Sequence, residues 1–228
     1  MNKLKLLYEV ITTMKKKEII KGCVKVEGTK DQVSVFSMVN EFEKNMAEGS
    51  TKAKISTEMN HGGSKIKNES IIESDGSSLP KHMLHGPMGP MHFHRHGHFE
   101  NSGEGCEPRH FSLKGKLNKL AFMFGILNNM KVDELEDKNI VLSLDLNDIP
   151  DDIKESMHEH MNAANKIHQH DGFMKEFHDM DNPEFEVKVL INSNNEVEKV
   201  QINSKGKSKD EKKEEHNMNF EAELNLAW

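Results

Sequence analysis

Alternation of apolar and polar residues is the feature that most limits what this chain can fold into. The clearest example is 51–60, where every second residue is apolar or uncharged: Ala53, Ile55, Thr57 and Met59. A period of two places such side chains on one face of an extended strand. Strands with one polar face are typical of an antiparallel sheet that has one side in water.

Similar stretches, separated by turn residues, predict about eight strands in the 228-residue chain. Their expected ranges are 23–27, 32–44, 51–60, 64–74, 139–147, 185–191, 196–203 and 218–228. The first of these is a short strand bracketed by Gly22 and Gly28. The run of mixed charge at 205–215 predicts a solvated hairpin tip between the last two strands.

Helical spacing of apolar residues predicts three helices, over 3–17, 113–129 and 150–168. In the first, the expected buried stripe is Leu4, Leu7, Ile11 and Met14. Together the elements predict an α+β fold in which two to three helices cover the apolar face of a one-sided antiparallel sheet. No internal repeat or second core is visible, so we expect a single domain over 1–228.

Residues 75–111 interrupt this order of elements. The segment holds four of the six prolines, six of the 15 glycines and seven histidines, without sustained periodicity. It is too long for an ordinary connection, and such segments are either functional or disordered. We therefore expect a flexible, histidine-, glycine- and proline-rich insertion within the domain.

The order of elements resembles the LolA-like/LppX-like lipoprotein-carrier superfamily. The matching stretches are the first helix running into Lys21–Gly28, strand Asn139–Leu146 running into helix Asp151–Met161, and the strands Phe185–Asn192 and Glu196–Asn203. The resemblance implies a curved half-barrel whose mouth is closed by helices, and binding of acyl chains or other apolar ligands between sheet and helices. It carries over no functional residue.

An apolar ligand is the first expectation for function, held by a non-catalytic, carrier-like protein. Many of the 15 methionines and 11 phenylalanines fall at positions expected in the interior, where flexible methionine packs adaptably. We expect a cavity between sheet and helices that binds a lipid-like small molecule. Its candidate lining is Phe36, Phe42, Leu120, Phe124, Leu144 and Phe220.

Metal binding or buffering is the alternative, because twelve of the 14 histidines fall within 82–110 and 158–178. Neutral imidazole suits Zn, Ni and Cu(II), and a thiolate favours Zn or Cu(I). The candidate ligands are His92, His94, His96, His98, Cys106 and His110. A histidine-rich tether with only weak, tag-like metal affinity is the competing interpretation, and a pH-sensitive opening near pH 6 is a third.

Other classes of protein have less support in the sequence. The formal net charge of −7 argues against a general nucleic-acid binder, and no apolar run is long enough to span a membrane. Motifs such as G-x-S-x-G or H-E-x-x-H do not occur, so no enzyme and no obligatory cofactor are expected. Two widely spaced cysteines and a poor match to a signal peptide or lipobox indicate a reducing, cytoplasmic setting.

Overall fold

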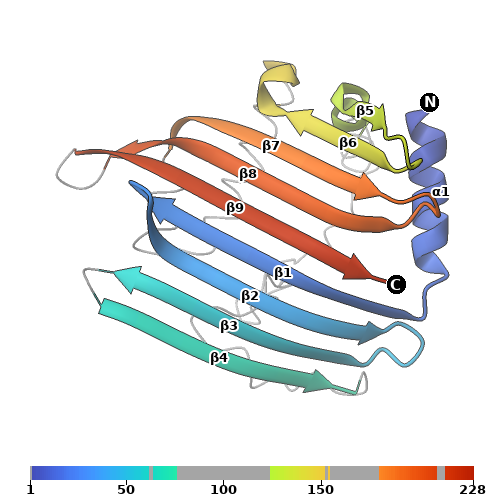
Figure 1. Cartoon of the computed structure of the whole chain (residues 1–228), viewed down its shortest axis with the longest axis horizontal. Coiled ribbons are helices and arrows are strands. Elements are labelled where there is room, and N and C mark those ends of the chain that lie inside the picture. Colours follow the sequence, from blue (N-terminus) through green and yellow to red (C-terminus); the bar gives the residue numbers. More distant parts are fainter. Residues whose placement is uncertain (1, 62–63, 76–123, 152–153, 155–179, 210–213) are drawn as a thin grey trace, which may run out of the picture.

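The computed structural model of the chain describes residues 2–61, 64–75, 124–151, 154, 180–209 and 214–228. Most of these residues lie in strands, with one long helix near the start of the chain (Figure 1). The elements are α1 (Lys3–Lys15), β1 (Ile19–Lys30), β2 (Val33–Asn45), β3 (Thr51–His61), β4 (Ser64–Ser74), β5 (Lys131–Glu134), β6 (Ile140–Asp145), the 3-10 turn η1 (Leu146–Asp148), β7 (Asp181–Ile191), β8 (Val197–Lys209) and β9 (Glu215–Ala227). Residues 124–129 form a further short helical segment.

The nine described strands form one antiparallel sheet in the order β4-β3-β2-β1-β9-β8-β7-β6-β5. Consecutive strands are neighbours throughout each half, and β9 pairs with β1 to join the two halves. The sheet is open, with β4 and β5 at its opposite edges (Figure 1). The antiparallel sheet predicted from the alternating pattern is therefore confirmed, with one strand more than expected.

Strand register separates an apolar face from a charged face. One cross-strand row contains only apolar side chains across five neighbouring strands: Leu142, Val189, Val200, Leu224 and Val24. The adjacent row on the other face contains only polar side chains: Ser143, Lys188, Gln201, Glu223 and Lys25. The period of two seen in the sequence thus becomes a one-sided sheet, as expected.

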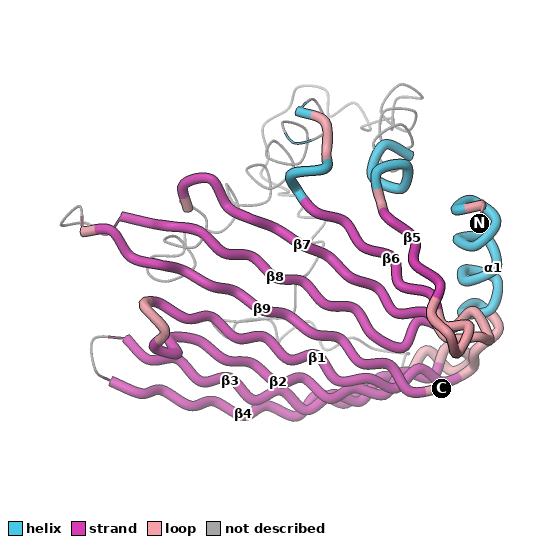
Figure 2. Tube along the Cα trace, turned by 45° about the horizontal axis from the view of Figure 1, so that its top comes forward, coloured by secondary structure: helices cyan, strands magenta, loops and turns pink. Residues whose placement is uncertain are grey.

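Helix α1 packs over one end of the apolar face, beside β5 and β6 (Figure 2). Its residues Leu6 and Val10 are buried against Ile140, Leu142 and Ile191. Asn2 caps the helix by accepting hydrogen bonds from the backbone N–H groups of the first turn. The best-packed part of the described structure is therefore the corner formed by α1, β6 and β7.

The rotation of α1 about its axis differs from the prediction. Leu6 and Val10 are the buried residues, whereas Leu4 and Ile11, expected in the buried stripe, are exposed. Both sets of residues have helical spacing, because α1 carries apolar side chains over more than half of its circumference. The sequence predicts a helix in either case, but the choice of buried stripe depends on the sheet against which it packs.

Several strand boundaries also differ from the prediction. β1 is not confined to 23–27 but runs from Ile19 to Lys30 through both glycines, because it pairs along most of its length with β2 and β9. The predicted charged hairpin tip at 205–215 is wrong at both ends, because 205–209 continue β8 and Glu215 begins β9. The short strand β5 was not predicted, and β6 ends at Asp145, where η1 begins.

Parts of the predicted organisation fall outside the described residues. These include the insertion at 75–111, apart from Asp75, most of the helix predicted at 113–129, and nearly all of that predicted at 150–168. Residues 124–129, Asp151 and Lys154 are helical, as expected. Among the helices that the structure describes, none has the length and hydropathy needed to cross a membrane.

Candidate functional site

The apolar face of the sheet gathers most of the candidate ligand-binding residues. Phe36, Phe42, Leu144 and Phe220 all lie on this face, on strands β2, β6 and β9. Phe124 begins the short helical segment 124–129 and is half exposed. Leu120 lies outside the described residues. Four of the six candidates therefore share one surface, and the cavity expected between sheet and helices remains a prediction.

Register brings Phe36 and Phe220 into the same row. Both are paired with Gly28, one from β2 and the other from β9. Two strand spacings separate them, which is about 10 Å. Phe36 is buried, and the same row continues through Met59 on β3 and Ser204 on β8. Two aromatic side chains thus flank a position that has no side chain of its own.

Phe42 lies further along β2 and packs over Gly22. A Cβ atom at Gly22 would be 2.6 Å from Cζ of the Phe42 ring and 2.9 Å from the carbonyl oxygen of Asn225. Such distances are shorter than van der Waals contact, so only glycine fits beneath this ring. Here an aromatic side chain covers a strand glycine and fills the gap that the glycine leaves.

Leu144 lies in the other half of the sheet from Phe36 and Phe42. It lies on β6, five strands from β2, or about 24 Å along the sheet. Its row contains the apolar side chains of Val187, Ile202, Ala222, Val26 and Met38. Leu144 and Phe36 can therefore belong to one extended binding surface, but they are not neighbours in the sheet.

Two polar groups on the apolar face were not singled out from the sequence. The side-chain oxygens of Asn40 and Ser208 are buried and have no hydrogen-bond partner within the described structure. Register places both residues on the face that carries Val24 and Met218. Leaving a buried polar group unpaired costs about 1–3 kcal/mol, so each oxygen is a natural position for a polar group of a ligand.

The opposite face is covered by paired charges. Glu223 lies at the centre of one cluster, where its carboxylate contacts Lys199 Nζ at 2.8 Å and the side-chain amide of Asn225 at 2.7 Å. These contacts lower the pKa of Glu223 to about 2, with the hydrogen bond from Lys199 the largest cause. Lys21 and Lys188 form similar ion pairs with carboxylates on this face. The charged face therefore resembles a solvated outer surface.

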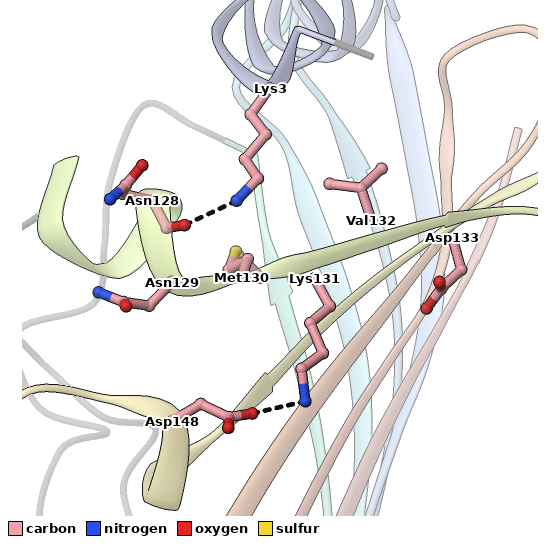
Figure 3. A pocket seen from close by; sticks show the side chains of 8 residues that line it. All are labelled: Lys3, Asn128, Asn129, Met130, Lys131, Val132, Asp133 and Asp148. Carbon is pink, nitrogen blue, oxygen red and sulfur yellow. Dashed lines mark hydrogen bonds and ion pairs between the residues drawn. The ribbon is translucent and has the colours of Figure 1, made fainter.

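A separate hollow of about 690 Å³ opens between α1, the segment 124–129 and β5 (Figure 3). Its lining is Lys3, Asn128, Asn129, Met130, Lys131, Val132, Asp133 and Asp148. Lys3 Nζ donates a hydrogen bond to the carbonyl oxygen of Asn128, and Lys131 Nζ lies 2.7 Å from Asp148, which raises the pKa of Lys131. This hollow is largely polar and both its lysines have partners. It is not the apolar cavity expected from the sequence.

The candidate metal ligands His92, His94, His96, His98, Cys106 and His110 lie outside the described residues. Within the described ranges, no three histidine, cysteine or acidic side chains are grouped closely enough to hold an ion. His216 instead contacts Asp31, with 2.7 Å between Nδ1 and Oδ2. That hydrogen bond and one from the backbone N–H of Asn217 lower the pKa of Asp31. The metal site remains a prediction.

No protein-family model matches the chain, and no curated protein matches it at a significant level.

Proposed function

We propose that this protein is a non-catalytic binding protein that holds an apolar, lipid-like small molecule against the apolar face of its sheet. The observation that carries the proposal is the register, which aligns apolar side chains in rows across most of a nine-stranded sheet. Exposed apolar patches on monomeric proteins rarely exceed a few hundred Å². A face of this extent therefore needs cover, and a bound ligand supplies part of it.

The binding region that we infer lies on β1, β2 and β9. Helix α1 packs against the apolar face near β6 and β7, at a distance from this region. Here Phe36 and Phe220 flank Gly28, and the next row contains Met38, Val26 and Ala222. An acyl chain suits such a surface because its flexibility matches that of methionine and its contacts are non-directional.

The polar end of the ligand is assigned to Asn40. Its side-chain oxygen is buried without a partner and accepts hydrogen bonds only. A hydroxyl group can donate to this oxygen, and the amide N–H groups of the same side chain can donate to a carboxylate. Asn40 therefore suits the hydroxyl or carboxylate end of an otherwise apolar ligand.

The proposal also includes the shape expected from the resemblance to lipoprotein carriers. In it, the sheet forms a curved half-barrel, and the helices predicted at 113–129 and 150–168 lie over the apolar face. Support for this arrangement comes from the open, one-sided sheet and from α1, which already covers one end of it. Phe124 and Leu120, both on the first of these helices, would then face the ligand.

Two adjacent residues of β2 provide a matched test. Met38 lies on the apolar face, whereas Val39 lies on the charged face, so the same substitution can be made on either side of the sheet. We expect a fluorescent fatty acid to bind the wild-type protein saturably, with one molecule per chain. Met38→Gln should weaken its affinity about tenfold, because burying an amide against an apolar ligand is unfavourable. Val39→Gln should leave the affinity unchanged.

Circular dichroism and the melting temperature of each variant report whether it is folded. Equal loss of affinity in two folded variants would show that the probe does not bind the apolar face. Non-saturable uptake by the wild-type protein would contradict the proposal altogether.

Metal handling is the second candidate, favoured by the alternating run of His92, His94, His96 and His98. We expect calorimetric titration with Zn, Ni or Cu to reveal a stoichiometric, sub-micromolar site that is lost on deletion of 81–110. Weak binding of all three metals alike would reduce this segment to a histidine-rich tether. We place both functions in a reducing compartment, in keeping with the free thiol of Cys23.

A further inference from the structure

The two edges of the sheet differ sharply. β5 is an edge of only four residues, whereas β4 has eleven and pairs with β3 in continuous register. Native sheets usually protect an edge with a short strand, a proline or a bulge. β5 has the first of these features. β4 has none of the three, and its protection is limited to the charged side chains on one face. β4 is therefore an open template for a further strand.

β4 is also exposed along most of its length. Every residue from Ser64 to Ile71 is exposed, including Ile66 at 54% and Ile71 at 71%. Within the part of the chain that the structure describes, no strand lies beyond β4. In an antiparallel ladder every second residue directs its N–H and C=O groups away from its neighbour. β4 thus offers a row of backbone donors and acceptors to a partner strand.

We propose that this edge binds the same edge of a second copy of the chain, so that two sheets join antiparallel about a twofold axis. One register pairs all eleven residues of β4 with β4 of the other copy, centred on Glu69. On the charged face it pairs each Lys65 with Glu73 and each Lys67 with Ile71. On the apolar face it pairs each Ile66 with Ile72 and each Asn68 with Ser70.

The self-complementarity of this sequence is what favours a second copy as the occupant. Opposite charges and apolar side chains directly across an antiparallel pair both stabilise it. A shift of two residues in either direction separates Ile66 from Ile72 and leaves residues at the strand ends unpaired. The centred register is thus the one that pairs the whole strand and sets its two apolar-face isoleucines opposite each other.

The one unfavourable contact in this register is between the two copies of Glu69 at the axis. Lys67 Nζ lies 3.3 Å from Glu69 Oε1 on the same strand, which offsets part of the repulsion. We therefore expect Glu69→Gln to strengthen the dimer. Loss of one negative charge from a chain of net charge −7 also lowers the general repulsion between copies. The comparison is therefore Glu221→Gln, which removes the same charge on β9, away from this edge, and should strengthen the dimer less.

The test is sedimentation equilibrium of the full chain over a range of concentrations. Lys65→Glu or Glu73→Lys replaces two attractive pairs with two repulsive pairs in each dimer, and we expect each to weaken dimerisation about tenfold or more. The double variant K65E/E73K restores both pairs with the charges exchanged. It should dimerise within about threefold of the wild-type affinity.

The double variant separates an interface effect from a folding effect. Within one chain Lys65 pairs with Glu58, and register places Glu73 beside Lys52. Exchanging both charges disrupts both of these contacts, so recovery of the dimer cannot come from repair of the monomer. In a mixture, K65E and E73K should also prefer each other to themselves, since all their opposed pairs are then attractive.

Lys54→Glu provides the control, because it makes the same charge change one strand away from the edge, on β3. We expect it to leave the dimer intact. A wild-type chain that stays monomeric into the millimolar range would overturn the proposal. So would a dimer that survives both single reversals, since it would have to form through another surface.

Discussion

At the scale of single residues, the contact between Gly22 and Phe42 could not be predicted from the sequence. The sequence predicts a strand that starts after Gly22, because glycine usually weakens strands. In the structure Gly22 is an interior residue of β1, and the ring of Phe42 lies against it. Which strand becomes the neighbour of β1, and in which register, decides whether a glycine ends a strand or accommodates a ring.

Gly22→Ala should lower the free energy of unfolding by about 1–3 kcal/mol, the usual cost of overpacking. The added Cβ would meet both a ring atom at 2.6 Å and a backbone oxygen at 2.9 Å, and the backbone cannot move aside easily. Gly206→Ala is the control, because the nearest atom there belongs to the flexible side chain of Met180, at 3.2 Å. Urea unfolding of both variants measures the difference. Equal stability of the two would contradict this packing.

Glu223 should give the protein part of its acid sensitivity. Its pKa is lowered to about 2 in the folded chain, against 4.5 for an ordinary glutamate. A lowered folded-state pKa adds stability that is fully present above about pH 4.5 and is lost as the pH falls towards 2. The stability gap between wild type and Glu223→Gln should therefore narrow between pH 5 and pH 2.

Urea unfolding at several pH values measures this gap. When Lys199 is first replaced by glutamine, the further change Glu223→Gln should cost less stability at neutral pH than it does in the wild type. The reason is that Lys199 is the largest cause of the lowered pKa of Glu223. A gap that does not change with pH would show that the carboxylate is not held by these contacts.

At the scale of elements, α1 shows where sequence periodicity stops being sufficient. The helix itself was predicted almost to the residue, because several apolar residues recur at helical spacing. Its orientation was not, because Leu4, Leu7 and Ile11 form as regular a stripe as Leu6 and Val10. Only contact with Ile140 and Ile191, more than 120 residues away in the chain, selects the second stripe.

Leu6→Ala and Leu4→Ala test this orientation with one residue type in one helix. Leu6 is 2% exposed and Leu4 is 53% exposed. We expect Leu6→Ala to cost about 2–5 kcal/mol, as for a buried leucine, and Leu4→Ala to cost less than about 0.5 kcal/mol. Chemical denaturation measures both. A larger cost for Leu4→Ala than for Leu6→Ala would show that the helix buries the stripe expected from the sequence.

The strands differ in how closely the sequence predicts their boundaries. Clean alternation predicted the ranges of β3 and β4 closely, because both strands have one charged face and short turns at their ends. The ends of β8 and β9 were missed, since residues such as Lys205 and Lys207 look like loop residues until a partner strand is known. Lys207 in fact pairs with Glu215 across the hairpin, with 2.6 Å between Nζ and Oε1.

At the scale of the whole molecule, the sequence predicted the one-sided antiparallel sheet but not the arrangement of the binding candidates. Alternation determines which face a side chain occupies, and so Phe36, Phe42, Leu144 and Phe220 share a face as expected. Their separation depends on strand order, and the pairing of β9 with β1 is a long-range feature that no local pattern encodes. That pairing brings Phe36 and Phe220 into one row and places Leu144 at a distance.

Photoaffinity labelling is the measurement that tests the central claim most directly. The wild-type protein is irradiated with a palmitic acid that carries a diazirine group, with and without excess unlabelled palmitic acid, and the labelled peptides are sequenced. We expect label on the apolar-face residues of β1, β2 and β9, Met38 and Phe220 among them, and its loss in the presence of the competitor. Label that resists competition, or that falls only on the charged face or the exposed side of α1, would contradict a ligand bound on the apolar face.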